Sequence, residues 1–87
     1  MEMKIDITYK SDRLKALRES RGLSQQKLAE MTGLSVRVLQ NYEQGVRDLN
    51  GAKLVTLLKL CNALGCNLID LVTDEETRDQ FDIYNKR

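Results

Sequence analysis

Residues 36–41, VRVLQN, include three polar side chains, Arg37, Gln40 and Asn41, that could form hydrogen bonds with the edges of nucleic-acid bases. Arginine can pair bidentately with guanine, and asparagine or glutamine can do so with adenine. In a helix, Arg37, Gln40 and Asn41 share one face, because residues three and four apart are neighbours. Leu39 faces the other way. This pattern fits the reading of a DNA major groove, although an ordinary exposed helix carries the same residue types. Composition alone therefore leaves both interpretations open.

The flanking residues predict that this segment is the second of two short helices, over 25–32 and 36–44. Ser24 and Ser35 are of the type preferred at helix N-caps, and Gly33 is of the type that ends a helix in a left-handed conformation. A turn this short, containing glycine, makes the two helices cross steeply. The outer face of 36–44 should then project from the domain.

The remaining pattern predicts three more helices, over 12–21, 51–64 and 68–72, with Asn50 as the N-cap of the fourth. The helix over 51–64 carries only a narrow polar stripe, so we expect it to be covered on most sides. Its apolar arc is centred on Leu54, Leu57, Leu58, Cys61 and Leu64.

Both ends of the chain alternate apolar and polar residues. The segment 3–10 and the tail around Phe81 and Ile83 therefore predict short strands, which could pair with each other or with a second chain. We divide the sequence into three parts. These are an N-terminal extended segment (1–11), a helical domain (12–73) and an acidic C-terminal tail (74–87).

Length and composition exclude most enzyme classes. The 87 residues make one small domain, without histidine and with only Cys61 and Cys66 as thiols. We expect no catalytic residue, no cofactor and no metal, because no general base or activated nucleophile is present. The two cysteines should pack as small apolar residues.

Charge is distributed unevenly along the chain. Residues 13–47 hold seven basic and three acidic side chains, and residues 70–87 hold three basic and six acidic ones. No apolar run approaches the roughly 20 residues of a membrane helix. We expect a cytoplasmic, nucleoid-associated protein without a membrane contact.

Residues 14–72 resemble the phage-repressor and Cro type of helix-turn-helix domain, also called the XRE family. The most specific stretches are GLSQQKLAEMTGLS, NYEQG and LLKLCNALGCNLIDLV. The resemblance implies an all-α, five-helix, lambda-repressor-like DNA-binding domain, extended by the short terminal strands predicted above. It also implies that 36–44 is the recognition helix.

The resemblance further implies roles for single residues. The positions expected to contact bases are Val36, Arg37 and Asn41. Those expected to contact the DNA backbone or flanking bases are Gln25, Ser35, Val38, Gln40 and Arg47. The family often has Thr or Ser at the position of Val38, and valine cannot donate to a phosphate. A structural ion pair is expected between Arg18 and Glu43.

Two functions from different classes follow. The first is a sequence-specific double-stranded DNA-binding transcriptional regulator, expected to be a repressor, that binds a palindromic operator as a homodimer. Its dimer surface could be the helix 68–72 or the terminal strands with Ile5, Ile7, Phe81 and Ile83, although these residues could equally cover their own core. The alternative is an antitoxin-like interaction module whose tail binds a partner protein.

Overall fold

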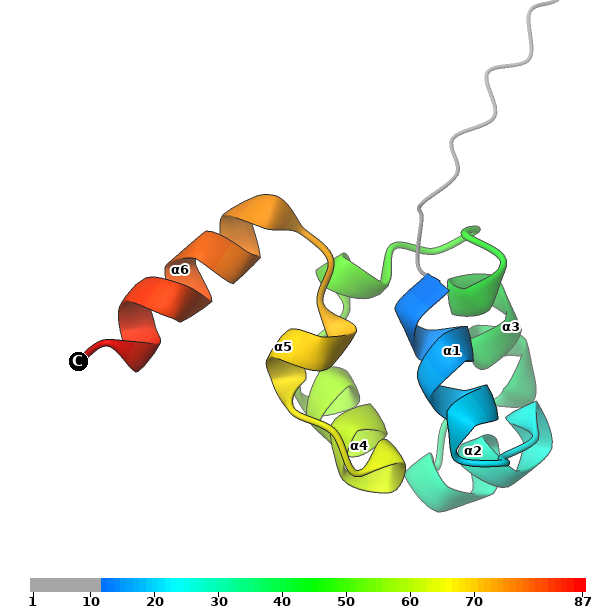
Figure 1. Cartoon of the computed structure of the whole chain (residues 1–87). Coiled ribbons are helices and arrows are strands. Elements are labelled where there is room, and N and C mark those ends of the chain that lie inside the picture. Colours follow the sequence, from blue (N-terminus) through cyan, green and yellow to red (C-terminus); the bar gives the residue numbers. More distant parts are fainter. Residues whose placement is uncertain (1–11) are drawn as a thin grey trace, which may run out of the picture.

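The computed structural model describes residues 12–87, and this part of the chain consists of helices and loops (Figure 1). The bounds are α1 Asp12–Ser20, α2 Gln25–Thr32, α3 Val36–Glu43, the 3-10 turn η1 Leu49–Gly51, α4 Leu54–Leu64, α5 Leu68–Leu71 and α6 Glu75–Asn85. The all-α, five-helix prediction is confirmed, with α6 as an addition. The strand predicted for 3–10 lies outside the described residues.

Side-chain caps and a glycine set the boundary between α2 and α3. The Ser24 hydroxyl accepts the Lys27 N–H at 3.0 Å, and the Ser35 hydroxyl accepts the Val38 N–H at 3.1 Å. Gly33 adopts φ 74°, a left-handed conformation that other residues reach only with strain. Both predicted caps and the predicted stop are therefore confirmed, and only three residues join the two helices.

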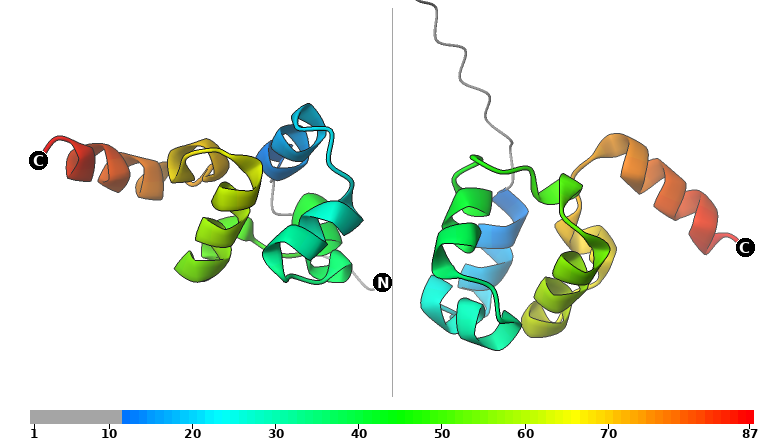
Figure 2. Two further views of the ribbon diagram at one scale, coloured as in Figure 1. Left: turned by 90° about the horizontal axis from the view of Figure 1, so that it is seen from below. Right: turned by 180° about the vertical axis from the view of Figure 1, so that it is seen from behind.

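One leucine-rich core joins the helices of the domain. Every element from α1 to α5 contributes at least one leucine that is almost completely buried. Helix α2 packs on α3 and α4, while α1 packs on α3 and α5, as the views in Figure 2 show. The fully buried leucines are Leu14, Leu28, Leu39, Leu49, Leu60, Leu64 and Leu71.

The prediction for the start of the fourth helix was wrong. Helix α4 begins at Leu54, and Asn50 lies in the separate turn η1. The Asp48 carboxylate accepts the Asn50 N–H at 3.0 Å and so caps this turn. The Asn50 side chain instead contacts Thr73, 23 residues further along the chain. A local pattern cannot reveal such a contact.

The expectation that α4 is covered on most sides was also wrong. Leu54, Val55 and Leu58 are 61%, 54% and 45% exposed within the described structure. Leu57, Cys61 and Leu64 of the predicted arc are buried as expected, together with Leu60. One long side of α4 is therefore apolar and open to solvent.

The strand predicted near Phe81 and Ile83 was wrong as well, because this part of the tail is helix α6. The Asp74 carboxylate accepts the N–H and the hydroxyl of Thr77, at 3.0 and 2.7 Å. These bonds lower the pKa of Asp74. Acidic residues in the first turn further favour a helix. The capped and acidic first turn favours a helix, whereas the alternation of only two apolar residues is a weak signal for a strand.

Candidate nucleic-acid interface

Helix α3 has a buried face and an exposed face. Leu39 and Tyr42 lie in the core, while Arg37 is exposed and Gln40 and Asn41 are half-buried. The three-residue turn after α2 leaves Ser35 and Arg37, at the start of α3, exposed at the surface. Arg37 is consequently the most accessible of the residues that the sequence assigned to base contact.

The other residues at the start of α3 differ in their exposure. Val36 and Val38 are half-buried and pack against the core cluster. Ser35 is exposed, and its oxygen is engaged by the Val38 N–H. Its hydroxyl proton is still free to donate to a phosphate. The structure thus supports a polar contact at Ser35 and leaves Val36 and Val38 with partly covered side chains.

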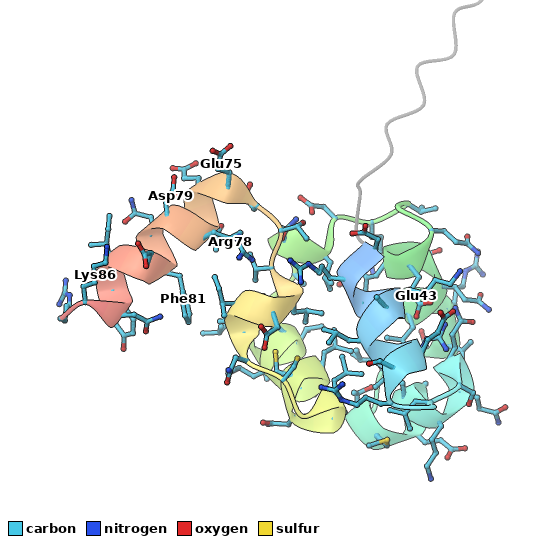
Figure 3. All side chains as sticks on the ribbon, viewed as in Figure 1. Glu43, Glu75, Arg78, Asp79, Phe81 and Lys86 are labelled. Carbon is cyan, nitrogen blue, oxygen red and sulfur yellow. The ribbon has the colours of Figure 1, made fainter. Side chains whose placement is uncertain are left out.

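Arg18 of α1 and Glu43 of α3 form a bidentate ion pair (Figure 3 shows Glu43 between the two helices). The Arg18 Nε and Nη2 atoms donate to Oε2 and Oε1 of Glu43, each at 2.9 Å. The side chains are only 11% and 3% exposed. A third donor, Nη1, reaches the Leu23 carbonyl at 2.8 Å. Hydrogen bonding to Glu43 raises the pKa of Arg18. The pair fixes the end of α3 against α1.

A chain of hydrogen bonds extends from this ion pair to the surface. The Gln25 amide donates to Glu43 Oε1 at 3.3 Å, and the Gln40 amide donates to Gln25 Oε1 at 3.4 Å. Glu43 therefore holds the Gln25 side chain at the start of α2, and Gln25 in turn contacts α3. Both glutamines were assigned to the DNA backbone from the sequence, and the structure brings them side by side.

Backbone hydrogen bonds place a basic pair beyond α3. The Asn41 carbonyl accepts the N–H groups of Val46 and Arg47, at 2.9 and 3.1 Å. Arg47 and Lys53 then line one hollow next to α3. Sequence reasoning missed Lys53, which holds the N-cap position of α4 without a side-chain capping bond. Only the fold of the intervening loop brings these two cations together.

In residues 12–87, no group of three His, Cys, Asp or Glu side chains could hold a metal ion. Burial raises the pKa of the Cys61 thiol to about 12, and the neighbouring Cys66 contributes to this rise. The thiol therefore stays protonated. No described helix has the length and apolar character needed to cross a membrane.

Known proteins resemble this chain in sequence and fold. A family model described as helix-turn-helix matches residues 14–71. The crystal structure of the restriction-modification controller protein C.AhdI from Aeromonas hydrophila is 38% identical. It matches with a TM-score of 0.63, covering 70% of this chain and 88% of that one. The clp gene regulator ClgR from C. glutamicum is 27% identical, with a TM-score of 0.60 over 69% of this chain and 74% of that one. No curated protein sequence matches significantly.

Proposed function

Because this chain belongs to the helix-turn-helix family of DNA-binding transcriptional regulators, we propose that it reads a specific duplex sequence with α3 in the major groove. The observation that carries the proposal is the two-faced α3, with Leu39 in the core and Arg37 in solvent. The family match also confirms the expectation that the chain is not an enzyme.

The exposed polar groups suggest a division of labour on DNA. Arg37 and Asn41 would bond to base edges, with the accessible part of Val36 against a thymine methyl. Phosphate contacts would come from the side chains of Gln25, Ser35, Gln40, Arg47 and Lys53, with Val38 beside the flanking sugar. Phosphate contacts supply much of the affinity of a DNA-binding protein. Of these side chains only Arg47 and Lys53 are cations, so one copy should bind weakly.

A homodimer on a palindromic operator solves this problem of weak binding. Two half-sites one helical turn apart, roughly 34–36 Å, double the number of contacts and the length of sequence that is read. A dimer bound in this way would occlude its operator, so we propose repression as its effect.

Selection from random duplex DNA on the purified protein, at about 100 mM salt, tests this function. We expect an inverted repeat whose half-site centres are about 10 base pairs apart or a multiple of that. Binding that is salt-sensitive but indifferent to sequence would contradict the proposal.

The Arg37→Ala variant tests the assigned base contact. It should lose about 1–3 kcal/mol of binding free energy and relax the preference at one base-pair position. Its fold should be unaffected, since Arg37 is exposed. Titration of operator duplexes that differ at each position measures both effects.

Gln25→Ala is the matched control for a backbone contact. This variant should weaken binding to all sequences alike, because phosphates carry no sequence information. If Arg37→Ala behaved in the same uniform way, α3 would not be the recognition helix.

The antitoxin-like alternative rests on α6, which has no buried residue and exposes Ile83 and Tyr84. In that case, removal of residues 74–87 would leave the DNA affinity unchanged and abolish capture of a partner protein. This segment holds five acidic and three basic residues, so a basic surface on the partner protein would complement it.

A further inference from the structure

Helix α6 exposes two large apolar side chains, Ile83 and Tyr84, in the described structure. It lies beyond the residues matched by the family model, which end at 71. None of its residues is buried, and Figures 1 and 2 show it leading away from the other helices. An isolated helix of 11 residues is marginal in water. Packing against another surface would stabilise it.

The start of α6 is held by two sets of hydrogen bonds. Arg78 Nη1 donates to the carbonyls of Ile69 and Val72 at the end of α5, at 2.8 and 2.7 Å. The side-chain Oδ1 of Asn50 accepts the N–H groups of Thr73 and Asp74, at 2.9 and 3.2 Å. These contacts connect the start of α6 to α5 and to the turn η1.

The two sides of α6 differ in character. Figure 3 shows Glu75 and Asp79 on its outer edge, and Phe81 on the edge toward α5. Phe81 and Tyr84 are in contact, with ring centroids 6.4 Å apart. Tyr84 and Ile83 are 66% and 60% exposed. Ile83 lies one turn beyond Asp79, whereas Tyr84 lies one turn beyond Phe81. The exposed neighbours Ile83 and Tyr84 are therefore the apolar side chains that α6 offers to a partner, with the Asp79 carboxylate beside Ile83.

The same chain offers a surface of matching character. Leu54, Val55 and Leu58 on α4 form an exposed apolar strip, and Lys59 lies next to it on the helix surface. A contiguous apolar patch with a polar rim is typical of an interaction site. Residues 12–73 hold nine basic and six acidic side chains, whereas residues 74–87 hold three and five. Net charge thus favours contact between α6 and the body of another copy.

We propose that α6 of one copy docks on the apolar strip of α4 in a second copy, and that the second α6 docks reciprocally. Each chain then supplies one arm and one receiving surface, which closes a two-fold dimer. This inference rests on the proposed function, which calls for a dimer, and it names the surfaces that form it. The reciprocal contact is what distinguishes a second copy from an unrelated partner protein.

Two charge variants of the full chain test the arrangement without DNA. The α4 variant is Leu54→Glu/Leu58→Glu, and the α6 variant is Ile83→Lys/Tyr84→Lys. All four positions are exposed, so each variant should keep its helical circular dichroism spectrum. By light scattering on a sizing column at micromolar concentration, we expect about twice the 10.0 kDa chain mass for the unaltered chain and the single-chain mass for each variant. Val46→Glu, at an exposed valine outside both surfaces, is the matched control and should remain dimeric.

An equimolar mixture of the two variants gives the decisive result. In the mixed dimer, one contact joins an unaltered α6 to an unaltered α4, and the other joins lysines to glutamates. The dimer mass should therefore return. If α4 packed on α4, the α6 variant alone would stay dimeric, and if α6 packed on α6, the α4 variant alone would stay dimeric. A mixture that remained monomeric would overturn the proposal. A dimer in either variant alone, or a monomeric unaltered chain, would also overturn it.

The outcome is separable from that of the proposed function. A dimeric chain that reads sequence through Arg37, and whose two charge variants both stay dimeric, would overturn the α6 contact alone. A chain that dimerises as described but selects no DNA sequence would overturn the proposed function and leave the α6 contact intact.

Discussion

Glu43→Ala is expected to lower the free energy of unfolding by about 3–5 kcal/mol, because it leaves the charge of Arg18 buried without its partner. Arg18 would keep only its bond to the Leu23 carbonyl and a 4.0 Å approach to Glu19. A small domain has only about 5–15 kcal/mol of stability in total, so the loss is severe. Urea denaturation followed by circular dichroism measures it.

The double variant Arg18→Met/Glu43→Leu is the control for this effect. Replacing both charges with apolar groups of similar size should restore most of the stability, since neither charge then remains unpaired. Affinity for DNA should stay reduced, because Gln25 loses the carboxylate that holds its amide. A loss below about 1 kcal/mol in Glu43→Ala would mean that the pair behaves as a solvated surface pair.

Leu39→Ala is expected to destabilise the fold by about 2–5 kcal/mol, because it opens a cavity under the recognition helix. Leu39 is fully buried, so shortening its side chain removes packing contacts in the core. Binding to DNA should fall in proportion to the unfolded fraction. Denaturant titration and DNA titration at the same temperature measure the two effects.

Arg37→Ala is the matched control on the same helix. An exposed substitution of this kind should change stability by no more than about 0.5 kcal/mol while changing base preference. If Leu39→Ala altered base preference in molecules that remain folded, the core side of α3 would influence readout directly. That result would contradict the separation of roles proposed for the two faces.

The central part of the fold could be predicted from the sequence because its signals are local. Ser24, Gly33 and Ser35 act on backbone groups within four residues of themselves, so their patterns name the ends of α2 and α3 directly. The alternation of Leu39 with polar neighbours likewise predicts which face is buried. Interactions between residues this close in the chain can be predicted from the sequence.

The errors came from causes that a local pattern does not contain. Asn50 was taken as a helix cap, yet its side chain is used by the connector at Thr73 and Asp74. Leu54 and Leu58 are as apolar as core residues, and only the placement of α5 and α6 decides that they stay exposed. In the tail, the alternation at Phe81 and Ile83 predicted a strand, but the segment is a helix capped by Asp74.

The candidate site shows the same division. Arg37 and Asn41 could be identified from residue type and helical spacing. Arg18 and Glu43 lie 25 residues apart, and only the family resemblance suggested that they pair. Lys53 was missed because its proximity to Arg47 depends on the path of the loop between α3 and α4.

The two-faced character of α3 has a consequence for the divergence of related regulators. Stability depends on Leu39 and Tyr42, and readout is assigned to Arg37 and Asn41, within one helix of eight residues. Because exposed positions tolerate replacement at little cost to stability, mutation can change the recognised sequence while the scaffold stays intact. A population can therefore explore new operators in single steps, each of which passes through a folded protein.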